Sequence, residues 1–137
     1  MVTQALLLHE QEQPLASLKL ALEKHSVGTV RAHSCREALS MLDQDNSPML
    51  FFTDLTVSDG SWADALRLAS QTRRPVCLIV VSQLVDIPLY IAAMESGAFD
   101  FMVPPFWDDD VAFLVRRATN DVARRQATKS RAVGRAA

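Results

Sequence analysis

Five short apolar runs alternate along the chain with five segments of helical periodicity, and this alternation restricts the fold more than any other feature. The most apolar run, VCLIVVS at residues 76–82, is the best candidate for a central strand. The other runs cover residues 4–9, 29–34, 49–54 and 99–103. Strands that alternate with helices in this way form a parallel sheet covered by helices on both faces. The sequence therefore predicts an α/β fold with five strands and right-handed crossovers.

Terminal signals place the helices between these runs. The first helix is expected over residues 12–25, where Pro14 suits the first turn, and Ser34 is expected to cap the second. The remaining helices are expected after residue 61, over residues 87–95 and from residue 108. Three aspartates, Asp108 to Asp110, open the last helix, because carboxylates are stabilised at the positive end of the helix dipole.

Polar side chains stand where the predicted strands end. In an open parallel sheet, ligands bind at the carboxyl ends of the strands, and the residues at these positions are His9, Glu10, Asp54, Ser82 and Pro104. The strand-forming run FFT ends directly on the carboxylate of Asp54. An aspartate there is either the cap of a turn or the reactive group of a site. Ser82 is likewise either a site hydroxyl or the N-cap of the next helix.

The net charge of −2 is unevenly distributed. From residue 116 to residue 137 there are seven basic residues and one acid, so this end carries +6 and the remainder carries −8. This basic end is either the solvated terminus of the last helix, followed by a frayed tail, or a segment that binds an acidic partner such as nucleic acid. Because it has neither interleaved aromatic residues nor a helix-turn-helix pattern, nucleic-acid binding is not expected.

Composition indicates one globular domain with a cytoplasmic location. Apolar residues make up 49% of the 137 residues, which is enough for one core. No apolar run approaches the roughly 18 residues of a membrane span, and the N-terminus lacks the basic region of a signal peptide, so no membrane partner is expected. Cys35 and Cys77 lie far apart and are expected to be reduced, structural thiols.

Four segments together resemble the receiver domain of bacterial response regulators: ALLLHE at residues 5–10, MLFFTDLTVSDGS at 49–61, CLIVVS at 77–82 and SGAFDFMVPPF at 96–106. The resemblance covers about residues 3–122. The separations agree with that family: 44 residues from Glu10 to Asp54, 28 from Asp54 to Ser82 and 50 from Asp54 to Pro104.

This resemblance implies a particular version of the α/β fold. It is the CheY-like, flavodoxin-like (βα)5 arrangement, doubly wound, with strand order 2-1-3-4-5. The expected organisation is a receiver domain over residues 1–125, followed by a basic, disordered C-terminal tail over residues 126–137.

The resemblance also implies roles for the residues at the strand ends. Asp54 would accept a phosphoryl group from a histidine kinase or a phosphotransfer protein. Mg²⁺ would be held by the carboxylates of Glu10 and Asp54 and by the backbone carbonyl of Thr56, which are the oxygen ligands that this cation prefers. His9 would be a further ligand of this Mg²⁺ only as a neutral imidazole.

Two further residues match the switch of the family. Ser82 matches the hydroxyl that binds a phosphoryl oxygen, and Phe101 matches the aromatic residue of the fifth strand that turns inward when the hydroxyl moves. This switch would alter the surface formed by the fourth helix, the fifth strand and the fifth helix, which is also the expected homodimer surface. A downstream output protein or domain would then recognise that surface.

Four positions depart from the pattern of the family. His9 stands where a second acid is usual, which removes one negative charge from the metal site. Pro104 replaces a lysine that pairs with the phosphoryl oxygens, and proline has neither a charge nor an N–H. Ser58 replaces a proline of the loop, and Trp62 replaces a glycine before the third helix. Mg²⁺ stays the expected cofactor, and these departures leave weak or absent binding as the alternative.

Two functions remain open at this point. The first is a receiver module of a two-component phosphorelay. Such a module catalyses only its own phosphorylation and dephosphorylation and is not expected to be an enzyme otherwise. The second is a degenerate receiver that acts as a phosphorylation-independent docking or dimerisation module, which the missing lysine and acid favour. A flavin carrier on the same architecture is not expected, because the loop HEQEQP at residues 9–14 has no glycine or hydroxyl to cradle phosphate.

Overall fold

The computed structural model describes residues 3–136, with side chains described for residues 3–129. Five parallel strands form one sheet in the order β2-β1-β3-β6-β7. These strands are β1 (Gln4–Leu8), β2 (Gly28–Ala32), β3 (Leu50–Thr53), β6 (Cys77–Val81) and β7 (Asp100–Met102). Counted in chain order, they agree with the order 2-1-3-4-5. The predicted five-stranded parallel sheet is confirmed.

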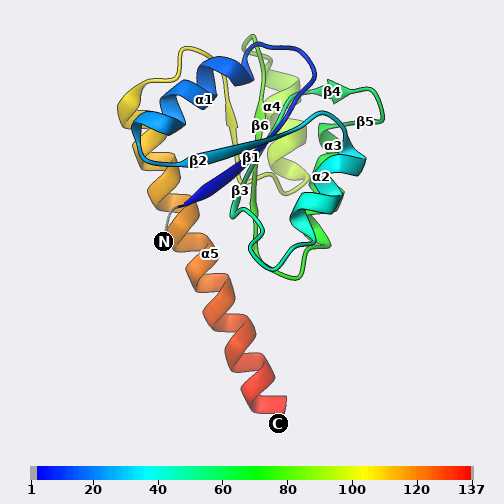
Figure 1. Ribbon diagram of the computed structural model, residues 1–137, viewed down its shortest axis with the longest axis vertical. Helices are drawn as coiled ribbons and strands as arrows, with labels where there is room; N and C mark the ends of the chain where they lie inside the picture. The colour runs from blue at the N-terminus through cyan, green and yellow to red at the C-terminus, as the bar shows by residue number, and fades with distance from the viewer. Residues whose placement is uncertain (1–2, 137) are drawn as a thin grey trace.

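Five helices cover the two faces of this sheet, as Figure 1 shows. On one face lie α1 (Leu15–Lys24) and α5 (Asp108–Ala136), and on the other lie α2 (Cys35–Leu42), α3 (Trp62–Ser70) and α4 (Ile87–Glu95). Because successive strand residues point to opposite faces, Phe52 packs in the core under α1 and α5, whereas Phe51 packs in the core under α2, α3 and α4. Both side chains are fully buried, so β3 is a central strand.

The terminal signals placed several helix ends correctly. The Ser34 hydroxyl caps α2 by accepting the Glu37 N–H at 3.1 Å, and the three aspartates form the first turn of α5. The fourth helix has the predicted bounds, Ile87–Glu95. The first helix is shorter than predicted, because Pro14 occupies its N-cap position and not its first turn.

A short hairpin occupies residues 56–61, where a loop was expected. Its strands are β4 (Thr56–Val57) and β5 (Gly60–Ser61), which pair antiparallel and form a second, two-stranded sheet. Two-residue strands have no detectable periodicity, so the pattern of the sequence could not reveal them. The hairpin leads directly into α3.

The last helix differs from the expected disordered tail, because α5 continues to Ala136. Figure 1 shows its final turns projecting beyond the body of the molecule. Residues 126–136 contain no proline and are rich in alanine and arginine, which favour helix. Two basic side chains also hold this helix to the segment before β6: Arg125 donates to the Val76 carbonyl at 3.0 Å, and Lys129 donates to the Arg73 carbonyl. The domain boundary at residue 125 stays a prediction.

The 29 residues of α5 include many charged side chains. Among residues 3–136, no helix combines the length and the apolar character that crossing a membrane requires.

Candidate functional site

The candidate site lies at the carboxyl ends of three neighbouring strands. The register pairs Leu8 with Thr53 and Thr53 with Val80, so β1, β3 and β6 end at the same edge of the sheet. Sheet-like hydrogen bonding continues beyond the strands: the Asp54 N–H donates to the Leu8 carbonyl at 2.9 Å, and the Ser82 N–H donates to the Met102 carbonyl at 2.9 Å. The fold therefore brings the predicted residues of these strand ends to one edge.

Asp54 follows the central strand and is half-buried. Its Oδ1 accepts the N–H of Leu55 at 2.8 Å, which orients the carboxylate. Burial raises the pKa of this carboxyl, and the Leu55 hydrogen bond and the nearby His9 oppose part of that rise. A carboxylate held at the tip of a strand with limited hydration is suited to act as a nucleophile toward a positioned electrophile.

His9 has only 3% of its surface exposed. Burial lowers the pKa of its imidazole below the usual 6.5, so the ring is neutral at pH 7. Its Nδ1 lies 2.6 Å from the Gln11 carbonyl, which is an acceptor, so Nδ1 carries the proton. His9 therefore adds no positive charge to the edge of the sheet, and its role as a metal ligand stays a prediction.

Glu10 is exposed, unlike the buried His9 before it. Its Oε1 accepts the N–H of Ser58, 48 residues away in the β4–β5 turn. Arg31 holds the backbone of the same loop, because its Nη2 donates to the Glu10 carbonyl at 3.0 Å and its Nε donates to the His9 carbonyl at 3.4 Å. Arg31 was not among the predicted site residues, because its only signal in the sequence is a charge inside a weak strand.

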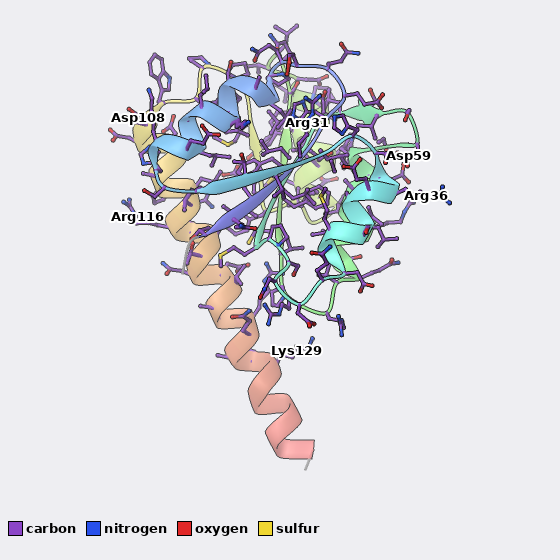
Figure 2. All side chains as sticks on the ribbon, viewed as in Figure 1. Arg31, Arg36, Asp59, Asp108, Arg116 and Lys129 are labelled. Carbon is purple, nitrogen blue, oxygen red and sulfur yellow. The ribbon has the colours of Figure 1, made fainter. Side chains whose placement is uncertain are left out.

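The β4–β5 hairpin is attached to α2 as well. The carboxylate of Asp59 accepts the N–H groups of Cys35 at 2.8 Å and Arg36 at 3.1 Å, and these bonds lower the pKa of Asp59. Figure 2 shows Asp59 beside Arg36 at the start of α2, with Arg31 near the loop that follows β1. On the other side, Ser61 and Asp64 form a capping box at the start of α3.

Thr56 and Trp62 stand at the two ends of this hairpin. Thr56 lies on β4, two residues after Asp54, and is exposed. The N–H of Trp62 donates to the Leu55 carbonyl at 2.9 Å, and its half-buried ring packs against the core under α2, α3 and α4. The expected metal-ligand role of the Thr56 carbonyl stays a prediction.

Ser82 is not the N-cap of α4. Asp86 caps that helix by accepting the Leu89 N–H at 3.0 Å. The buried Ser82 hydroxyl instead donates to the Leu84 carbonyl at 2.8 Å and stays within its own loop. The role of Ser82 as a site hydroxyl stays a prediction.

Phe101 and Pro104 lie on and after the edge strand β7. The Phe101 ring is half-buried and meets Tyr90 of α4 edge to face, with the centroids 5.8 Å apart and the planes at 87°. Pro104 follows the strand at the position of the usual lysine, and its bond to Pro105 is cis. No cationic side chain therefore occupies the lysine position of this strand end.

The arrangement of these groups does not fit a bound Mg²⁺. Among the described residues, no three His, Cys, Asp or Glu side chains are grouped to hold a metal ion. The Glu10 carboxylate is engaged by Ser58, and one Asp54 oxygen is engaged by Leu55. Mg²⁺ is bound through one or two free carboxylates plus water in octahedral geometry, so Glu10 would have to leave Ser58 before it served as a ligand.

Comparison with known proteins places this geometry in context. The sequence matches no protein-family model. It is 29% identical over 98 residues to the transcriptional regulatory protein FixJ of Rhizobium meliloti (strain 1021), which covers 72% of this chain and 48% of FixJ. The chain thus spans about half the length of this curated relative.

Several solved structures share the fold. A response regulator receiver domain from Clostridium thermocellum superposes with a TM-score of 0.73 at 23% identity, over 93% of this chain and 99% of that one. The receiver domain of a putative Luxo repressor from Vibrio parahaemolyticus gives 0.72 at 24% identity, over 88% and 95%. NtrX from Brucella abortus, crystallised with ADP, gives 0.78 at 20% identity, over 95% of this chain and 29% of that chain.

These likenesses confirm the resemblance to response regulator receiver domains. The fold of the chain is the CheY-like receiver fold, and the similarity to FixJ agrees with it. Within that fold, Asp54 directly follows the central strand β3, which lies between β1, followed by Glu10, and β6, followed by Ser82.

Proposed function

We propose that this chain is a receiver module of two-component signal transduction and that Asp54 accepts a phosphoryl group from a histidine kinase or a phosphotransfer protein. The observation that carries the proposal is the placement of Asp54, a half-buried carboxylate at the carboxyl end of the central strand of a receiver fold. In the transfer, a carboxylate oxygen attacks the phosphorus of a phosphohistidine. The N–P bond breaks as the acyl phosphate forms, and the imidazole leaves with its electron pair.

Catalysis of this step rests on positioning and on neutralising the phosphoryl oxygens. The Leu55 N–H holds Asp54 in place. A divalent cation would supply the missing positive charge, and we propose that Mg²⁺ is bound weakly or not at all. Pro104 offers no cation in place of the lysine, so the chemical step is expected to be on the order of 10²–10³-fold slower than with a donor at that position.

The proposed response uses Ser82 and Phe101. To reach a phosphoryl oxygen, the Ser82 hydroxyl must leave the Leu84 carbonyl, and the loop that joins β6 to α4 must move with it. Space vacated by that loop would admit the Phe101 ring, which now packs on Tyr90. The surface of α4, β7 and α5 would change, and an output protein or domain would recognise the change.

A second candidate function has its own supporting observation. The start of α4 and the loop before it expose a group of large apolar side chains: Leu84, Val85, Ile87, Tyr90 and Ile91 are between 44% and 75% exposed. Exposed apolar groups of this kind mark interaction sites. A degenerate receiver would use this surface for phosphorylation-independent docking, or for homodimerisation through α4, β7 and α5.

One experiment separates the two candidates. The purified chain is incubated with acetyl phosphate and MgCl₂, and phosphoryl incorporation is measured by intact-protein mass spectrometry. Asp54→Ala is the test variant, and Asp45→Ala, an exposed aspartate outside the site, is the matched control. A receiver module gains one phosphoryl group in the wild type and in Asp45→Ala, but not in Asp54→Ala. Absence of incorporation in all three favours the degenerate receiver.

A further inference from the structure

The contact between Glu10 and Ser58 joins an expected Mg²⁺ ligand to one of the positions at which this chain departs from the receiver pattern. We propose that Glu10 is a latch that ties the β1–α1 loop to the β4–β5 hairpin, and that the backbone N–H of Ser58 determines whether this carboxylate is free to bind a divalent cation. The inference deepens the proposed function, because it concerns the cation affinity of the same site.

The hairpin offers a fixed anchor for this latch. Asp59, next to Ser58, binds the first two N–H groups of α2, and the capping box of Ser61 and Asp64 joins the other strand to α3. Gly60 lies so close to its neighbours that an added Cβ would stand 2.8 Å from the Cys35 sulfur. The Ser58 N–H therefore occupies a defined position, held from two helices.

The other end of the latch is fixed by Arg31. Its guanidinium binds the carbonyls of both His9 and Glu10, so the backbone of Glu10 is held while its side chain reaches the hairpin. A glutamate has one methylene more than the aspartate common at this position, which lengthens its reach. The carboxylate that would serve a cation beside Asp54 is thereby engaged elsewhere.

Ser58 controls the contact through its backbone and not its side chain. A proline at this position has no N–H and could not hold Glu10. Ser58 and Asp59 are the two residues of the turn between β4 and β5, and neither has a positive φ. Proline is favoured at the first central position of turns whose central residues have negative φ, so Ser58→Pro suits this backbone and removes the N–H donor. Ser58→Ala keeps the N–H donor.

The test is a titration with MgCl₂ that is monitored by isothermal titration calorimetry and by the fluorescence of Trp62. Since one charge-assisted hydrogen bond has to be broken before Glu10 is free, Ser58→Pro is expected to bind Mg²⁺ about five- to tenfold more tightly than the wild type. Ser58→Ala should match the wild type within about twofold. Combining Ser58→Pro with Glu10→Ala should abolish the gain, because the freed carboxylate is its source.

The latch is overturned if Ser58→Pro and Ser58→Ala bind Mg²⁺ equally, or if the gain survives in the double variant. A second measurement does not depend on proline: Glu10→Ala alone should leave the Mg²⁺ affinity of the wild type within about twofold, and a tenfold loss would show that Glu10 is already a ligand. Phosphorylation is scored separately. If Asp54 does not accept phosphate but Ser58→Pro gains Mg²⁺ affinity, the proposed function is rejected and the latch is retained. If Asp54 accepts phosphate but Ser58→Pro gains no Mg²⁺ affinity, only the latch is rejected.

Discussion

Burial shifts the pKa of several side chains toward the neutral form, among them Asp54, His9 and Cys77. It raises the pKa of Asp54, lowers that of His9 and raises that of the Cys77 thiol to about 11. In each case the neutral form is favoured, because a poorly hydrated charge costs free energy. At the edge of the sheet this keeps His9 neutral beside Asp54. Inside the core it keeps Cys77 a thiol, which agrees with its expected structural role.

The shift at Cys77 predicts a loss of stability in alkaline solution. Below pH 9 the thiol is protonated in both the folded and the unfolded chain, so it contributes no pH dependence. Between about pH 9 and pH 11 only the unfolded chain ionises, and the free energy of unfolding should fall by on the order of 2–3 kcal/mol. Urea unfolding of the wild type and of Cys77→Ala across this range measures the difference.

Cys77→Ala should have a smaller pH slope, whatever its stability at pH 8. The comparison cancels the contributions of all groups that the two proteins share. Equal slopes in the two proteins would contradict the prediction.

The β4–β5 hairpin is the element that organises the candidate site. It contains only four strand residues, yet it meets the β1–α1 loop through Ser58, α2 through Asp59 and α3 through Ser61. Carboxylates make all three connections by accepting backbone N–H groups. Such contacts depend on the backbone being close, and Gly60 is the residue that permits this close approach.

Gly60→Ala is therefore expected to destabilise the protein. Its Cβ would stand 2.8 Å from the Cys35 sulfur and 3.0 Å from an Asp64 oxygen, distances that force either neighbour to shift. A cost of about 1–3 kcal/mol is expected, as for other overpacked positions, and thermal or urea unfolding measures it. Adding Cys35→Ala should restore part of the loss, because it removes one of the two clashes. A double variant no more stable than Gly60→Ala would argue against this account.

The surface around the start of α4 exposes several large apolar side chains. Leu84, Val85 and Ile87 are all at least 60% exposed around the start of α4. Nearby, Tyr90 joins this surface to Phe101 of the edge strand. An edge strand flanked by exposed apolar side chains suits a second copy of the chain, which would cover both.

If this surface forms the proposed homodimer, Ile87→Glu should weaken association by at least tenfold, because a charge would be buried without a partner. Sedimentation or light scattering over a range of protein concentrations measures the effect. Leu20→Glu is the matched control, since Leu20 is 63% exposed on α1, on the opposite face of the sheet. A wild type that stays a single chain at every concentration would dismiss the homodimer, and an equal loss in Leu20→Glu would dismiss this surface.

The amino-acid sequence alone was sufficient for the layered α/β fold and for the set of residues at the strand ends. Apolar periodicity and helix caps are local properties, and for this reason the strands around Phe51 and Leu78 and the Ser34 cap were found where predicted. The resemblance to receiver domains supplied the expected roles, and the comparisons confirmed the fold that it implied.

Other features depend on contacts between segments that are distant in the sequence. The Glu10 carboxylate finds the Ser58 N–H, 48 residues away, only because β1 and β3 lie side by side. Asp86, and not Ser82, caps α4, and the Ser82 hydroxyl binds the Leu84 carbonyl within its own loop. The final turns of α5 meet the segment before β6 through Arg125 and Lys129. Periodicity indicates which face of an element is buried, but the partner of a polar group is set by the packing of the whole chain.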